Sequence, residues 1–209
     1  MKRKLWSYGG VAASVVLIAF GIVTIMVAAN GRSEVRGDIK REAIVGTPDM
    51  TPKAIAGEAK QAGLTDVSLP TCSVAGESID TGSEARCFAS YMRIHALEAT
   101  GGKTYAQMPR YATQNGKGTN DVKAALTENG KPVDNPARNV WITETALSTA
   151  LNTSYFAEQV SLFSLAMGIA LLLSGIGFLV LTVRLLAPGA RPEETRAPTR
   201  VGASPAASL

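Results

Sequence analysis

The sequence has very little of what catalytic and metal sites are usually built from. Its 209 residues include a single histidine, His95, and only two cysteines, Cys72 and Cys87. One histidine does not supply the several ligands of a zinc site, or the two histidines and one carboxylate of a non-haem iron site. The redox motif C-x-x-C and the haem-attachment motif C-x-x-C-H are both missing. We therefore expect no catalytic residue, no bound metal and no cofactor, and we expect His95 to be a helix residue with a hydrogen-bonded ring.

Nucleotide and nucleic-acid binding also lack support. The string GGKT, residues 101–104, resembles the end of a phosphate-binding loop, but the pattern G-x-x-x-x-G-K-[ST] requires glycine where this chain has Leu97. The net charge of +4 comes from basic residues near the two ends of the chain, whereas charges balance closely between residues 30 and 158. A nucleic-acid interface needs a cationic patch on a folded surface. We expect no nucleic-acid partner and read GGKT as the end of a helix.

Charge is absent from two long stretches, residues 5–31 and 159–183. Each exceeds the roughly 20 apolar residues that a helix needs to cross the hydrocarbon core of a bilayer. Neither run contains an ionisable group of the kind that marks an ion path or a proton relay. The pattern predicts transmembrane helices over residues 5–29 and 159–187. They separate a basic N-terminus (1–4), a central domain (30–158) and a C-terminal tail (188–209).

Basic residues predict the orientation of the two spans. MKRK precedes the first run, and Arg184, Arg191, Arg196 and Arg200 follow the second. Positively charged flanks stay in the cytoplasm, so both termini are predicted to be cytoplasmic and the central domain extracytoplasmic. The alternative is a cleaved signal peptide, but the apolar core of such a peptide is typically about 7–15 residues long. The tail is rich in Pro, Ala, Arg and Ser and is expected to be disordered.

The central domain shows helix signals rather than strand signals, which predicts a mainly α fold. A polar, glycine-containing stalk is expected over residues 30–41. Helix starts are indicated at Thr51-Pro52, at the T-x-x-E capping box of Thr81 and Glu84, and at Asn135-Pro136. The second of these helices should run to about Ala99. The third can continue without a proline into the second span, with an apolar stripe of Val140, Leu147, Leu151 and Tyr155.

The predicted location settles how the two cysteines are interpreted. In an oxidising compartment, two cysteines in one small domain most often form a disulfide. A bond between Cys72 and Cys87 would close a short loop and contribute about 3 kcal/mol in the chain-entropy description. The sequence therefore predicts two membrane helices flanking a small, disulfide-stapled helical domain outside the membrane.

Two surfaces are candidates for contacts. In the membrane, Ala166, Ala170 and Ser174 recur at four-residue spacing, and Gly21 lies in the middle of the first span. Small residues let helix backbones approach in lipid, so this face of the second span should meet either the first span or a partner. In the outer domain, cations and aromatics alternate, a pattern that suits a sugar or an acidic polymer but also an ordinary solvated loop. These residues are Lys103, Tyr105, Arg110 and Tyr111.

Three segments resemble a family of two-span actinobacterial membrane proteins that often carry the label aromatic ring-opening dioxygenase. They are IVGTPDMTPKAIAGEAKQAGLTDVSLPTCSVAGESI, ARCFASYMRIHALEATGGKTYAQM and ARNVWITETALSTALNTSYFAEQ, within residues 44–183. The resemblance implies an integral membrane protein of the actinobacterial cell envelope and transfers no catalytic residue. We expect a non-enzymatic accessory protein that contacts lipid and another membrane or envelope protein, or itself. An extracytoplasmic ligand-binding or sensing module is the alternative, and a ring-opening enzyme comes third.

Overall fold

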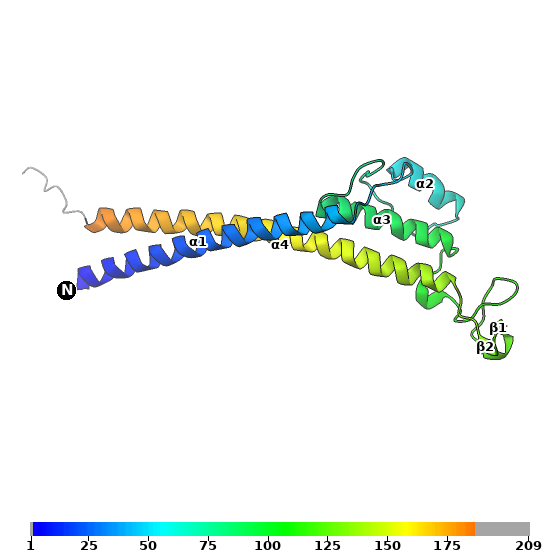
Figure 1. Cartoon of the computed structure of the whole chain (residues 1–209). Helices are drawn as coiled ribbons and strands as arrows, with labels where there is room; N and C mark the ends of the chain where they lie inside the picture. Colours follow the sequence, from blue (N-terminus) through cyan, green and yellow to red (C-terminus); the bar gives the residue numbers. More distant parts are fainter. Residues whose placement is uncertain (1, 187–209) are drawn as a thin grey trace, which may run out of the picture.

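Two long antiparallel helices, which we call the hairpin, carry a small helical domain at one end, which we call the outer domain (Figure 1). The computed structural model describes residues 2–186, with side chains from residue 8 to residue 184. The order of elements is α1 (Lys2–Arg41), α2 (Pro52–Gln61), α3 (Gly82–Ala99), the 3₁₀ turns η1 (Tyr105–Gln107) and η2 (Val122–Ala124), β1 (Thr127–Glu128), β2 (Lys131–Pro132) and α4 (Ala137–Leu186). The expected mainly α fold, with two apolar helices flanking a small disulfide-containing region, is confirmed.

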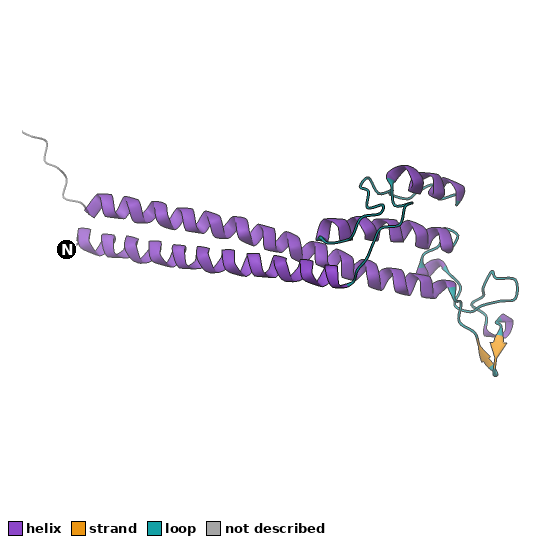
Figure 2. Ribbon diagram, turned by 45° about the horizontal axis from the view of Figure 1, so that its top comes forward, coloured by secondary structure: helices purple, strands orange, loops and turns teal. Residues whose placement is uncertain are grey.

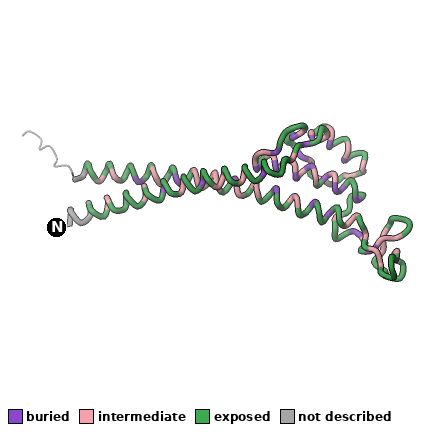
Figure 3. The backbone as a smooth tube through the Cα atoms, viewed as in Figure 1, coloured by how far each residue is buried: buried purple, intermediate pink, exposed green. Residues whose placement is uncertain are grey.

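Helices α1 and α4 pack along a seam that repeats every seven residues. Ser14, Gly21 and Ala28 are the buried positions of α1 in this region, and Gly168 and Gly175 are their counterparts on α4. A seven-residue repeat is the pattern of two helices in a left-handed supercoil. Figure 3 shows the buried positions recurring along this seam while the outer faces remain exposed.

Glycine brings the two backbones close together at the centre of the seam. A Cβ atom added to Gly21 would lie 2.7 Å from the backbone nitrogen of Leu172. One added to Gly168 would lie 3.0 Å from the carbonyl oxygen of Gly21. Side chains larger than hydrogen are therefore excluded at both positions, which is how small residues permit helix association without a hydrophobic driving force.

The small-residue stripe of the second span does not take part in this seam. Ala166, Ala170 and Ser174 all lie on the exposed side of α4. A helix turns about 100° per residue, so these positions point away from the face that contains Gly168 and Gly175. Four-residue spacing of small residues alone did not identify the face that meets α1. That the stripe contacts a partner stays a prediction.

The polar stalk expected over residues 30–41 is instead helical. Helix α1 continues without a break to Arg41, because its last turns pack on the outer domain: Ile39 is buried and Val35 contacts the same core. Within the described residues, the segments Tyr8–Arg41 and Ala137–Arg184 are long and apolar enough to cross a membrane, with mean hydropathies of 2.7 and 2.3 in their most apolar windows. The expected tail, residues 188–209, lies outside the described residues.

The outer domain stacks α2 and α3 beside the N-terminal half of α4 (Figure 2). The predicted helix starts are confirmed. Thr51 Oγ1 accepts a hydrogen bond from the backbone N–H of Ala54 at 3.2 Å, and the Thr81–Glu84 capping box is complete. The larger side chains buried in the core of this domain are Met50, Ile55, Val74, Ile79, Tyr91, Ile94, Leu97, Met108, Trp141 and Leu151.

A disulfide and a hydrogen bond hold the two ends of α3 in place. The predicted disulfide between Cys72 and Cys87 is present, with the two Cα atoms 6.1 Å apart, and it joins the segment before α3 to the first turns of that helix. At the other end, the indole N–H of Trp141 lies 2.7 Å from the carbonyl oxygen of Lys103, just past the helix-ending glycine pair. That pair, Gly101 and Gly102, has positive φ as a helix end favours.

Candidate functional site

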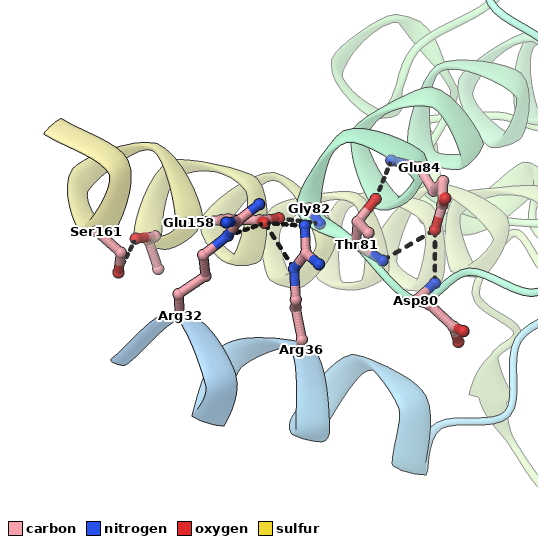
Figure 4. A network of polar contacts seen from close by, with 9 residues as sticks. Arg32, Arg36, Asp80, Thr81, Gly82, Glu84, Glu158 and Ser161 are labelled. Carbon is pink, nitrogen blue, oxygen red and sulfur yellow. Dashed lines mark hydrogen bonds and ion pairs between the residues drawn. The ribbon is translucent and has the colours of Figure 1, made fainter. Parts of the chain in front are cut away.

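A single buried carboxylate joins three helices where the apolar hairpin meets the outer domain. Glu158 of α4 is only 3% exposed. Its Oε1 accepts hydrogen bonds from Nε of Arg32 at 2.9 Å and Nε of Arg36 at 2.7 Å, both on α1. Its Oε2 accepts the backbone N–H of Gly82, the first residue of α3, at 2.7 Å. Figure 4 shows the two arginines reaching across to Glu158 from α1. We call Arg32, Arg36, Gly82 and Glu158 the Glu158 cluster.

The cluster keeps Glu158 ionised. Burial by itself would raise the pKa of Glu158, but hydrogen bonds from Arg32, Gly82 and Arg36 together outweigh it and lower that pKa. The carboxylate also satisfies an N–H group that the start of α3 would otherwise leave without an intrahelical partner. Negative charge is favourable at this end of a helix. One anion thus pairs with both arginines and caps α3.

Close backbone contact supports the same junction. A Cβ atom on Gly82 would lie 2.7 Å from Cα of Tyr155, so glycine is required where α3 begins against α4. The guanidinium of Arg86, one turn further along α3, lies 4.7 Å from the ring centroid of Tyr155. Glycine, a cation–π contact and a carboxylate therefore fix α3 against the turns of α4 that precede its apolar run.

Sequence analysis missed the Glu158 cluster because its members are far apart in the chain. The arginines and Glu158 are separated by 126 and 122 residues. One signal was available: two arginines four residues apart follow the first apolar run, and an acidic residue stands directly before the second. In a hairpin of two antiparallel spans, these flanks meet at the same level.

The second polar cluster surrounds His95, the only histidine. Nε2 of His95 lies 3.2 Å from Oδ2 of Asp49 and 3.5 Å from Oε2 of Glu58. The Nε2 atom has almost no accessible surface and makes no hydrogen bond with any described residue. The expectation of a hydrogen-bonded His95 ring is therefore wrong for this nitrogen. We call Asp49, Glu58 and His95 the His95 cluster.

Backbone contacts position Asp49 in its loop. The backbone N–H of Gly46 donates a hydrogen bond to the carbonyl oxygen of Glu77 at 2.9 Å. The backbone N–H of Gly76 donates to the carbonyl oxygen of Gly46 at 2.8 Å. A Cβ on Gly46 would collide with the carbonyl oxygen of Val74 at 1.8 Å, so this close approach requires glycine. A hydrogen bond from the Thr47 side chain and the proximity of His95 lower the pKa of Asp49, against the opposing effect of burial.

An open groove runs beside His95 between α3 and α4, with a volume of about 520 Å³. Its lining is mostly apolar, with the buried residue Glu144 at one side. Val140, a member of the predicted apolar stripe of this helix, lines the groove and is 38% exposed. The other lining residues are Met92, Ala96, Ala99, Pro136, Asn139 and Thr143.

The predicted ligand patch is only partly assembled. Tyr105 and Arg110 line one groove of about 380 Å³ together with Arg138, whose guanidinium lies 3.9 Å from the ring centroid of Tyr105. Tyr111 is buried, 9% exposed, and Arg110 covers its ring. Lys103 does not line this groove. Sequence reasoning missed Arg138 because it lies on α4, remote in sequence from the rest.

Comparison of the chain with models of protein families, with curated proteins and with solved structures found no match.

Proposed function

We propose that this chain is a non-enzymatic accessory protein of an actinobacterial cell envelope, anchored by two spans with both termini in the cytoplasm. Its outer domain docks a membrane or envelope protein, or a second copy of the chain. Three features support this: two helices apolar enough to span a membrane, basic residues at their predicted cytoplasmic ends, and a disulfide typical of oxidising compartments.

The Glu158 cluster is the observation that carries the proposal. Helix α4 is continuous over 50 residues, and the 22 of them before the second apolar run extend for about 33 Å. Because one buried carboxylate binds α1, α3 and α4 together, the outer domain cannot swing freely on the hairpin. A rigid arm of this kind would hold a docking surface at a set height above the bilayer, which suits a protein that docks a partner.

The chemistry of the described residues also favours a non-enzymatic role. Both cysteines are joined in a disulfide and offer no thiol nucleophile. Nε2 of the only histidine faces two carboxylates rather than a hydroxyl group. A nucleophile next to a general base, the arrangement that covalent catalysis requires, is not formed by these groups.

Site-specific photocross-linking in native membranes tests the proposal. A photoreactive residue is placed at Ile142, an exposed position on the outer part of α4 that is 55% exposed, and a control at Tyr8, which is 74% exposed at the other end of the hairpin. We expect one dominant adduct of defined mass from Ile142, weakened in a Glu158→Gln background. A docking role is contradicted if Ile142 gives no discrete adduct, or the same set of adducts as Tyr8.

The alternative, a ligand-binding module, is supported by the groove of Tyr105, Arg110 and Arg138. Arg138 is only partly buried, and its guanidinium lies 3.9 Å from the ring centroid of Tyr105. Such a group suits an anionic ligand stacked on an aromatic ring. Titration with oligogalacturonate, compared between the natural chain and Arg138→Met, would show saturable binding that the substitution removes. Equal weak binding by both proteins would dismiss this alternative.

A further inference from the structure

We propose that Asp49, Glu58 and His95 form a binding site for one divalent metal ion of the zinc class. The site goes beyond docking and does not depend on it. It also revises the sequence-based expectation of no metal, which rested on the number of histidines alone. Two carboxylates reach His95 only because α2 and the loop before it fold over α3.

The two distances from His95 to the carboxylates match the edges of a metal coordination tetrahedron. Zinc binds histidine nitrogen and carboxylate oxygen at about 2.0–2.2 Å, and at tetrahedral angles this puts neighbouring ligand atoms about 3.3–3.5 Å apart. The distances from Nε2 of His95 to the oxygens of Asp49 and Glu58 are 3.2 and 3.5 Å. All three ligand atoms lie within 4.8 Å of one another.

The state of the His95 ring provides a second, independent observation. A histidine held only by a salt bridge would direct an N–H group at one oxygen. Here Nε2 approaches two carboxylate oxygens and makes a hydrogen bond to neither, while its own surface is almost fully covered. A buried nitrogen without a partner is costly. An ion between the three groups would accept the nitrogen lone pair and offset both negative charges.

The side chains are held in place yet open to solvent. Asp49 comes from the loop anchored at Gly46, Glu58 from α2 and His95 from α3. The side chains of His95, Asp49 and Glu58 are 31%, 38% and 29% exposed. An ion can therefore enter from the side of the partly exposed carboxylates, and water can complete a fourth position.

The donor set selects the class of ion. One imidazole nitrogen with two carboxylate oxygens suits zinc and neighbouring transition metals. Magnesium and calcium prefer oxygen ligands alone and larger coordination numbers. Because Cys72 and Cys87 are joined to each other, no thiolate of this chain competes for the ion.

The test is calorimetric titration of Zn²⁺ into the full-length chain in detergent, purified without a histidine tag and treated with chelator. We expect one equivalent to bind per chain. His95→Gln, Asp49→Asn and Glu58→Gln should each weaken binding by at least about 10- to 100-fold, the loss typical even for groups that only orient a ligand. Glu98→Gln is the matched control, because Glu98 is an exposed carboxylate on the same helix as His95, and it should bind as the natural chain does.

Thermal unfolding followed by circular dichroism shows whether each variant is folded at the titration temperature. If one variant is unfolded, the Zn²⁺ affinities of the remaining two test the site. The absorption spectrum of bound Co²⁺ gives a further measurement, in which the natural chain should show the d–d bands of a four-coordinate site with one nitrogen ligand. The proposal is overturned if the folded natural chain binds no Zn²⁺ at one equivalent. It is equally overturned if His95→Gln and Glu98→Gln bind Zn²⁺ alike. Magnesium at the same concentration should give no heat of binding, and preferential binding of magnesium would refute the assigned class.

Discussion

Replacing Glu158 with glutamine should loosen the outer domain from the hairpin. Glutamine has the same shape and keeps one acceptor oxygen, but it loses the charge and cannot accept from Arg32, Arg36 and Gly82 together. Hydrogen bonds to charged groups contribute about 1.5–3 kcal/mol each. Breaking a fully buried ion pair costs about 3–5 kcal/mol, but both arginines are 37% exposed and can be rehydrated. We expect a loss of about 2–3 kcal/mol from the free energy that keeps the start of α3 closed.

Hydrogen exchange measured by mass spectrometry reports the free energy of local opening at the start of α3. Peptides that cover the first turns of α3 should exchange about 30- to 150-fold faster in Glu158→Gln, because each 1.4 kcal/mol changes the opening equilibrium tenfold. The control is Glu34→Gln, an exposed carboxylate on α1 close to both arginines, which should leave exchange unchanged. Exchange in Glu158→Gln within threefold of the natural chain would refute the reasoning.

The same carboxylate predicts how stability depends on pH. The pKa of Glu158 is lowered in the folded protein from its ordinary value of 4.5, so its contribution is fully present above about pH 4.5 and is lost as pH falls through the folded value. Asp49, whose pKa is also lowered from 3.8, acts in the same direction at slightly lower pH. Acid should therefore destabilise Glu158→Gln less steeply than the natural chain, and parallel pH profiles would contradict this assignment.

Two further predictions concern the disulfide and the helix seam. Replacing both Cys72 and Cys87 with serine should cost about 3 kcal/mol of outer-domain stability; a midpoint of thermal unfolding equal to that of the oxidised chain would show that the disulfide does not stabilise the domain. Gly21→Leu should separate α1 from α4, because even a Cβ at this position approaches the backbone of Leu172 to 2.7 Å, whereas Gly9→Leu should be tolerated, since a Cβ there meets no atom within 4 Å. Distances between spin labels on the two helices measure the separation, and equal distances in both variants would contradict the seam.

Local signals explain why much of the fold was predictable from the sequence. The structure contains the two apolar helices, the helix caps at Thr51 and Thr81 and the predicted disulfide. The helices and caps depend only on short stretches of sequence, and the disulfide was predicted from the expected compartment. The helical end of α1 was missed because glycine and charge indicate a loop locally, while packing of Ile39 on the outer core favours helix. Tertiary contacts outweigh such weak local preferences.

The candidate sites were less predictable because they are assembled from distant segments. The His95 cluster draws on residues 49, 58 and 95, and neither carboxylate belongs to a motif that indicates a ligand. The seam of the hairpin was not identified from the sequence for a different reason. Ala166, Ala170 and Ser174 offered an obvious stripe of small residues, but the seven-residue recurrence of Gly168 and Gly175 marks the face that meets α1. The seven-residue spacing of Gly168 and Gly175 can be read from the sequence, but two glycines at this spacing can also occur by chance. The matching spacing of Ser14, Gly21 and Ala28 on the other helix is what marks the two faces as partners.

Measuring on which side of the membrane the outer domain lies is the most direct test of the account. A single cysteine replaces Asn115, an exposed residue in the loop between α3 and α4, in a chain that carries serine at positions 72 and 87. Intact cells are then treated with a membrane-impermeant maleimide. The account predicts that this cysteine is labelled in intact cells to the same extent as after permeabilisation. Labelling only after permeabilisation would place the domain in the cytoplasm and contradict the proposed topology.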